Sequence, residues 1–130
     1  MNILIAEDDF TSRMLLQEIL KGYGSVCTVI NGQEAVEAVK IGFERDEPFD
    51  LICLDIMMPE TDGHQALKEI RKIEQKRGVY SSDGVKIIMA TALGDMRNIS
   101  EAYSELCDGY LVKPIDKKSV LKTVDELFNL

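Results

Sequence analysis

Five short, mainly apolar runs recur along the chain, and each gives way to polar residues or to turn residues. They occupy residues 2–6, 26–30, 51–54, 87–90 and 109–112. Short apolar runs bounded by turn residues are typical of strands that are buried on both faces of a parallel sheet. The run at 51–54 is the clearest, because it leads directly into Asp55 and is soon followed by Pro59.

Between these runs the apolar residues recur at the spacing of one face of a helix. The stripes comprise Leu16, Ile19 and Leu20; Ala35, Val36 and Val39; Ala66, Leu67, Ile70 and Ile73; and Val120, Leu121, Val124, Leu127 and Phe128. A weaker stripe near residues 96–106 predicts the fourth helix in chain order. The predicted caps are Thr11 or Ser12 for the first helix, Asn31 with Glu34 as a capping box for the second, and Asp116 for the last. Strands that alternate with helices predict repeated right-handed βα units, which form an α/β fold around a parallel sheet.

Composition and charge narrow the classes of protein to consider. The chain has 130 residues, which suits one domain spanning residues 1–130. Its net charge of −8 argues against direct binding of nucleic acid, because phosphate contacts need a basic face. No apolar run reaches the length of a membrane span, and the immediate start with a strand leaves no room for a signal peptide. Cys27, Cys53 and Cys107 lie in or beside apolar runs and are expected to be buried free thiols. We therefore expect a cytoplasmic protein that contacts no membrane.

Polar side chains follow the predicted strands at the points where these strands end. Glu7 and Asp8 follow the first strand, Asp55 the third, Thr91 the fourth and Lys113 the fifth. A single aspartate at a strand end is more often an ordinary loop residue. A parallel sheet, however, brings all these ends to one edge, where open α/β sheets bind their ligands. We expect the five side chains to form one site.

Three carboxylates at one edge require either protonation or a cation. Two charges about 4 Å apart repel by roughly 4 kcal/mol at an effective dielectric constant of about 20. Carboxylate oxygens together with water are ligands that suit Mg²⁺. Beside such an ion, Asp55 is placed to attack phosphorus as a nucleophile, while Thr91 and Lys113 bind phosphoryl oxygens. The pattern predicts Mg²⁺-dependent chemistry on a phosphoryl group.

Four motifs make the sequence similar to that of a known family. They are residues 5–9 (IAEDD), 54–63 (LDIMMPETDG), 90–92 (ATA) and 112–115 (VKPI). Together they resemble the receiver domain of bacterial response regulators over the whole chain, and in particular the stand-alone receivers of the chemotaxis type. The resemblance implies a flavodoxin-like, doubly wound fold of five parallel strands, (βα)5, in the order 2-1-3-4-5.

The resemblance also implies a role for each residue of the site in two-component signal transduction. Asp55 would accept a phosphoryl group from a histidine kinase or a histidine phosphotransfer protein, and Thr91 and Lys113 would bind that group. The domain would then catalyse only its own phosphorylation and dephosphorylation, and it would not be an enzyme. The Mg²⁺ ligands would be Glu7, Asp8, Asp55 and the backbone carbonyl of Met57, with Asp8 favoured over Glu7 as the direct ligand of the acidic pair.

The expected signal is a change of conformation. Phosphorylation would draw the Thr91 hydroxyl inward and open space into which Tyr110 rotates. A downstream protein would read the surface formed by the fourth helix with Met96, the fifth strand and the fifth helix. The resemblance further implies a cis bond between Lys113 and Pro114, a minority form even before proline.

Two departures from the family and two other functions stay open. Residues 77–86 form a longer stretch than we expect for the family, and the chain ends with its last helix, as either a stand-alone receiver or a trimmed regulator would.

A Mg²⁺-dependent phosphohydrolase with an aspartyl-phosphate would need an aspartate two residues after Asp55, where this chain has Met57. Flavin or dinucleotide binding would want a glycine fingerprint or a hydroxyl-rich loop after the first strand, and neither is found there.

Overall fold

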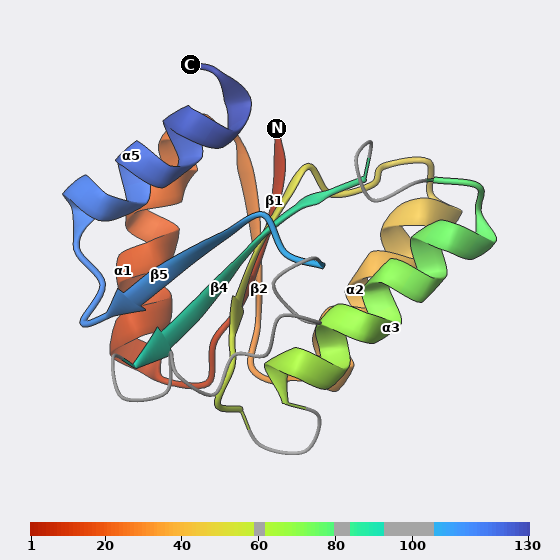
Figure 1. Cartoon of the computed structure of the whole chain (residues 1–130), viewed down its shortest axis with the longest axis horizontal. Coiled ribbons are helices and arrows are strands. Elements are labelled where there is room, and N and C mark those ends of the chain that lie inside the picture. Colours follow the sequence, from red (N-terminus) through yellow and green to blue (C-terminus); the bar gives the residue numbers. More distant parts are fainter. Residues whose placement is uncertain (59–61, 80–83, 93–105) are drawn as a thin grey trace.

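A sheet of five parallel strands forms the centre of the molecule. The computed structural model describes residues 1–58, 62–79, 84–92 and 106–130. Its strand order is β2-β1-β3-β4-β5, which confirms the order that the family resemblance implied (Figure 1). The strands are β1 (Asn2–Ala6), β2 (Ser25–Val29), β3 (Leu51–Asp55), β4 (Lys86–Ala92) and β5 (Gly109–Lys113). Strand β4 continues to Ala92, beyond the end of its apolar run, so Thr91 lies within the strand.

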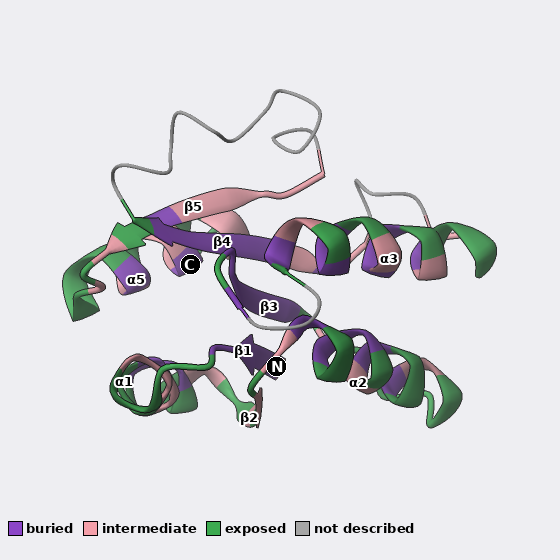
Figure 2. Cartoon of the chain, turned by 90° about the horizontal axis from the view of Figure 1, so that it is seen from below, coloured by how far each residue is buried: buried purple, intermediate pink, exposed green. Residues whose placement is uncertain are grey.

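Helices cover both faces of the sheet. Within the described residues they are α1 (Phe10–Leu20), α2 (Gly32–Glu44), α3 (Gly63–Lys76) and α5 (Lys117–Phe128), and the 3₁₀ helix η1 (Lys21–Tyr23) follows α1. Helices α1 and α5 lie on one face, and α2 and α3 lie on the other (Figure 2). This arrangement confirms the predicted α/β class. The fourth helix, with Met96, was expected almost wholly within residues 93–105, which lie outside the described residues. No helix among the described residues is long and apolar enough to cross a membrane.

The core consists of two apolar layers separated by the sheet. Alternate residues of a strand point to opposite faces, so Ile3 and Ile5 of β1 pack with α1 and α5, whereas Leu4 and Ala6 pack with α2 and α3. Every residue of β3 is buried, including Asp55 at its end. Because the central strands are enclosed on both faces, the packing determines where their carboxyl ends lie.

The helix caps agree with the sequence prediction except at α1. Asp9 caps this helix, because its side chain accepts a hydrogen bond from the Ser12 amide at 2.9 Å. The prediction of Thr11 or Ser12 was wrong, since α1 begins at Phe10 and both residues already lie in its first turn. Asn31 and Asp116 cap α2 and α5 as predicted.

The edge strand β2 explains why one cysteine was misplaced by the sequence prediction. Cys53 in β3 is buried and Cys107 is half-buried, but Cys27 in β2 is exposed. Within the part of the chain that the structure describes, strand β2 pairs only with β1. An apolar run alone does not distinguish an edge strand from a central one, and the edge strand leaves part of its surface in water.

Candidate functional site

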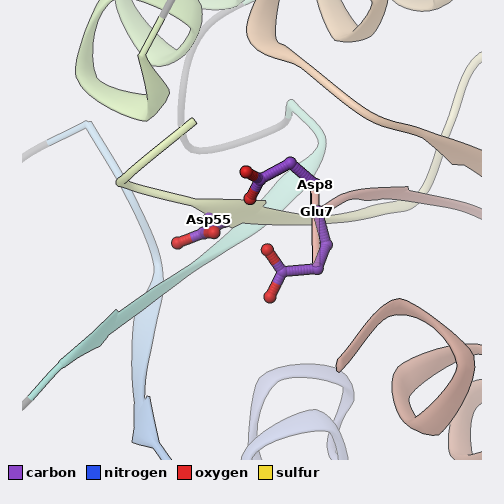
Figure 3. Close-up of side chains that lie close together, drawn as sticks. All are labelled: Glu7, Asp8 and Asp55. Atoms are coloured by element: carbon purple, nitrogen blue, oxygen red, sulfur yellow. The ribbon is translucent and has the colours of Figure 1, made fainter. Parts of the chain in front are cut away.

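The carboxyl ends of β1 and β3 bring three acidic side chains together. Glu7 and Asp8 follow β1, and Asp55 ends the neighbouring strand β3. Figure 3 shows their carboxyl groups around a common space, and one oxygen of each lies within 4.8 Å of the others. Glu7 and Asp55 are buried, whereas Asp8 is exposed. The cluster therefore opens to solvent on the side of Asp8.

Asp55 is held by contacts to both of its carboxylate oxygens. Its side chain is only 4% exposed. The Met57 amide donates a hydrogen bond to Oδ1 at 3.2 Å, and Nζ of Lys113 lies 3.0 Å from Oδ2. The start of α3 packs directly against this loop, because a Cβ at Gly63 would clash with the backbone of Asp55 and Ile56. These contacts hold the Asp55 carboxylate in one position at the carboxyl end of β3, whose other residues are apolar and buried.

Lys113 links the two buried carboxylates. Its Nζ lies 2.9 Å from Glu7 Oε1 as well as 3.0 Å from Asp55 Oδ2. Burial lowers the pKa of Lys113, but the contacts with Glu7 and Asp55 outweigh it, so the pKa lies above its ordinary value. The lysine therefore stays positively charged and partly neutralises the cluster. The Lys113–Pro114 bond is cis, as the family resemblance implied.

The surroundings of Glu7 raise its pKa. Burial, followed by its interaction with Asp55, raises the pKa of Glu7 from 4.5 to about 7, although Lys113 opposes the shift. Its Oε2 is buried and has no hydrogen-bond partner among the described residues. A buried oxygen of this kind needs a partner, because desolvation without one is costly.

The donor set fits a hard divalent cation. Glu7, Asp8 and Asp55 offer only oxygen ligands, and Glu7 Oε2 is buried without a hydrogen-bond partner among the described residues. Lys113 supplies one positive charge against three carboxylates. Cations that prefer oxygen, such as Mg²⁺ and Ca²⁺, bind this type of cluster. The side chains that could hold a metal are therefore those predicted from the strand ends.

Two other predicted residues, Thr91 and Tyr110, lie on β4 and β5, and Met57 follows β3. Thr91 is 1% exposed, and its hydroxyl donates to the Ala92 carbonyl at 3.3 Å. Tyr110 is half-buried on β5 and packs against the core layer of α2 and α3. Burial, followed by an interaction with Cys107, raises the Tyr110 pKa. The Met57 side chain is 67% exposed, and its backbone amide donates to Asp55.

One residue at the site gave no signal in the sequence. Arg13, on α1, donates from Nη1 to the backbone carbonyls of Glu7 at 3.0 Å and Asp8 at 3.4 Å. Its guanidinium also lies 5.5 Å from the centre of the Phe10 ring. These bonds hold the acidic segment against the helix that follows it. Because Arg13 lies inside a helix and not at a strand end, the pattern of apolar runs did not indicate it.

Comparisons with known proteins agree over nearly the whole chain. The family model described as "Response regulator receiver domain" matches residues 3–125. Chemotaxis protein CheY of Bacillus subtilis (strain 168) is 33% identical over 129 residues, which cover 98% of this chain and 97% of that protein.

Solved structures show the same similarity. A chain of the crystal structure of the CheX-CheY-BeF3-Mg+2 complex from Borrelia burgdorferi matches with a TM-score of 0.80 and 28% identity, covering 98% of this chain and 88% of that one. A second match is to the co-crystal structure of the Saccharomyces cerevisiae histidine phosphotransfer signaling protein Ypd1 and the receiver domain of its downstream response regulator Ssk1. It has a TM-score of 0.77 and 28% identity, and it covers 97% of this chain and 87% of that one.

Proposed function

Because this chain belongs to the family of response regulator receiver domains, we propose that it accepts a phosphoryl group on Asp55 and signals through a change of conformation. The observation that carries the proposal is the environment of Asp55. A nearly buried carboxylate is held by a backbone amide on one oxygen and by the Lys113 ammonium on the other. It lies beside two further carboxylates that can hold a cation. This is the set of groups that phosphoryl transfer to an aspartate needs.

In the proposed reaction the donor is a phosphohistidine of a kinase or a phosphotransfer protein. A carboxylate oxygen of Asp55 forms a bond to phosphorus, the phosphorus–nitrogen bond breaks, and the imidazole nitrogen keeps the electron pair. Lys113, already 3.0 Å from Asp55 Oδ2, pairs with an oxygen of the transferred group. The Thr91 hydroxyl, on the adjacent strand β4, exchanges its bond to the Ala92 carbonyl for one to the phosphoryl group.

Glu7, Asp8 and Asp55, together with the backbone carbonyl of Met57, are the proposed ligands of Mg²⁺. When bound, Mg²⁺ offsets the repulsion between the carboxylate and the incoming phosphoryl group. Glu7 takes part because its buried oxygen has no other hydrogen-bond partner among the described residues. Asp8 takes part because it is exposed at the mouth of the cluster, where a hydrated ion arrives.

The proposed partners are proteins. Phe10 and Met14, on the helix that follows Glu7 and Asp8, and Met57, two residues after Asp55, expose large apolar side chains, at 66%, 47% and 67% exposure. Exposed apolar groups of this kind favour protein contacts, and a phosphohistidine must be brought to Asp55 across this face. Since the yeast receiver domain similar to this chain was crystallised with a histidine phosphotransfer protein, a donor of the same class is proposed here.

The proposed signal passes through β5. Movement of Thr91 toward the phosphoryl group makes room for the Tyr110 ring, which is half-buried on the paired strand opposite Met89, two residues before Thr91. A downstream protein then reads the surface that contains β5, α5 and the segment between β4 and β5. Comparing the Tyr110 ring in the free protein and with a phosphoryl mimic tests this step. An unchanged ring orientation would contradict the proposed role of Tyr110.

The alternative is a Mg²⁺-dependent phosphohydrolase, which needs an acid/base group two residues after Asp55. Met57 occupies that position, and a methionine side chain transfers no proton. Incubation with acetyl phosphate and Mg²⁺ distinguishes the two functions by intact mass. A receiver accumulates a phosphorylated form that is absent from Asp55→Asn, whereas a phosphohydrolase releases phosphate over many turnovers. Failure of the wild type to become phosphorylated by any small phosphoryl donor would overturn the proposed function.

A further inference from the structure

A buried ionic cluster lies at the edge of the sheet opposite Asp55. It consists of Arg71 and Glu74 on α3 and of Asp108, the residue before β5. The Arg71 and Glu74 side chains are 8% and 2% exposed. Ionic groups are rarely buried so deeply unless they are paired and hydrogen-bonded. The cluster lies too far along the strands to belong to the phosphoryl site.

Arg71 connects α3 to the beginnings of two strands. Its Nε donates to the Leu106 carbonyl at 2.8 Å, and its Nη1 donates to the Val85 carbonyl at 2.9 Å. The guanidinium also pairs with Glu74 at 2.7 Å and with Asp108 at 3.0 Å. Val85 directly precedes β4, and Leu106 and Asp108 lie just before β5. One side chain thus attaches both strand entries to the same helix.

The two carboxylates complete these attachments. Glu74 accepts from the Val85 amide at 2.7 Å, and its carboxylate lies so close to Gly84 that a Cβ there would displace it. Asp108 accepts from the Ile87 amide at 2.8 Å, and its own amide donates to the Ile87 carbonyl at 2.8 Å. The pairing of β4 with β5 is thereby extended by one residue beyond the strand itself.

Strand β5 is an edge strand that ion pairs hold at both ends. Among the described residues it pairs only with β4. At the carboxyl end of β5, its exit, Lys113 contacts Glu7 and Asp55. At the amino end, its entry, Asp108 contacts Arg71. Phosphorylation of Asp55 would change the contacts at the exit, because the transferred group occupies a carboxylate oxygen. The contacts at the entry involve no atom of the phosphoryl site.

We propose that Arg71 is a positioning residue for the switch, which holds the entry of β5 so that a change at Lys113 moves Tyr110 and not the whole strand. This inference rests on the proposed function. Tyr110 lies between the two ends, two residues after Asp108 and three before Lys113. With the entry fixed, a displacement at the exit has to be taken up within β5. With the entry free, the edge strand shifts along β4 and the change at Tyr110 is lost.

Two variants and a matched control test this role. Arg71→Lys keeps the charge but loses the planar fork that reaches two carbonyls and two carboxylates at once. Asp108→Asn keeps an oxygen acceptor for the Ile87 amide and removes the ion pair with Arg71. Lys72→Arg is the control, because Lys72 is the exposed neighbour of Arg71 on α3 and the exchange is the reverse one.

Amide hydrogen exchange reports on the entry, and phosphorylation reports on the switch. In the unphosphorylated protein, Arg71→Lys should speed exchange of the Ile87 and Asp108 amides about tenfold while β1 stays unchanged. Acetyl phosphate with Mg²⁺ should phosphorylate Asp55 within about twofold of the wild-type rate. The shift of the Tyr110 ring signals on phosphorylation should fall to about half or less. Asp108→Asn should act in the same direction, and Lys72→Arg should behave as wild type.

Several results would overturn the proposal. Equal acceleration of exchange in β1 and β5 would mean that the cluster only stabilises the fold. A full Tyr110 response in Arg71→Lys, with faster exchange at the entry, would mean that the switch does not depend on this contact. Slower phosphorylation of Asp55 would mean that Arg71 affects phosphoryl transfer itself and not the later change at Tyr110. If Arg71→Lys fails to fold, Asp108→Asn carries the same comparison. A wild type that is never phosphorylated would instead refute the proposed function, and the switch role with it, whatever the exchange at the entry.

Discussion

Replacing Glu7 with glutamine is expected to stabilise the metal-free protein at neutral to alkaline pH, although it removes a proposed metal ligand. Burial and the neighbouring Asp55 raise the Glu7 pKa from 4.5 to about 7. In the unfolded chain the same carboxyl ionises near its ordinary pKa. Between these two values the folded protein holds a proton that the unfolded chain has lost. The free energy of unfolding therefore falls as the pH rises through this window, and it stays lower above it.

The size of the effect follows from the pKa shift. One pKa unit corresponds to about 1.4 kcal/mol, so the change from 4.5 to about 7 sets an upper bound of roughly 3 kcal/mol. Because neighbouring charges adjust when Glu7 ionises, the gain can fall short of this bound, and we expect about 1–3 kcal/mol for Glu7→Gln. With an unfolding entropy of about 2 cal/mol/K per residue, this gain raises the melting temperature by roughly 4–11 °C.

The assay is thermal unfolding in a chelator at about pH 4 and about pH 8, which lie on either side of the window. Glutamine imitates the protonated carboxyl, so the gain should be present at the higher pH and absent at the lower one. Glu126→Gln is the control, because Glu126 is exposed on α5. Adding Mg²⁺ should favour the wild type and reduce the difference. An equal gain at both pH values, or a loss at the higher one, would refute the reasoning.

Three further changes test the metal, the docking face and the lifetime of the signal. Millimolar Mg²⁺ should raise the melting temperature of the wild type, because it binds only the folded cluster, and Asp8→Asn should remove most of that rise. A wild-type melting curve indifferent to Mg²⁺ would contradict the metal site. Phe10→Ala should slow transfer from a phosphotransfer protein about tenfold and leave phosphorylation by acetyl phosphate unchanged, since the exposed ring is a docking contact. Equal slowing with both donors would place Phe10 in the chemistry. Met57→Asn combined with Leu93→Glu should shorten the lifetime of phosphorylated Asp55 about tenfold, because polar side chains can orient the attacking water. The family resemblance implies that the side chains two residues after Asp55 and two after Thr91 flank the path of this water. Leu93 lies outside the described residues, so this test rests on that resemblance, and equal decay of wild type and variant would disprove it.

The strands and the acidic residues at the edge of the sheet were predictable because both follow from the local pattern of apolar and polar residues. A short, wholly apolar run such as 51–54 can bury both of its faces only inside a layered sheet, and β3 is that strand. The polar residue that ends such a run must then lie at the edge of the sheet. This is why Glu7, Asp55 and Lys113 were expected to meet, and in the structure they do. The order of the strands came from the family resemblance, because apolar runs do not say which strands are neighbours.

The sequence by itself thus determined the elements and the chemical groups that line the edge, whereas the tertiary structure decided which partners those groups take. Lys113 bridges Glu7 and Asp55 only because β5 lies next to β4 and β4 next to β3. Arg71 looks like any arginine of an amphipathic helix, yet the chain folds so that it binds Asp108, 37 residues away. Cys27 lies in an apolar run but is exposed, because β2 is an edge strand. The physical reason is the same in each case: burial and ion pairing depend on groups that are distant in the sequence, and no local pattern records them.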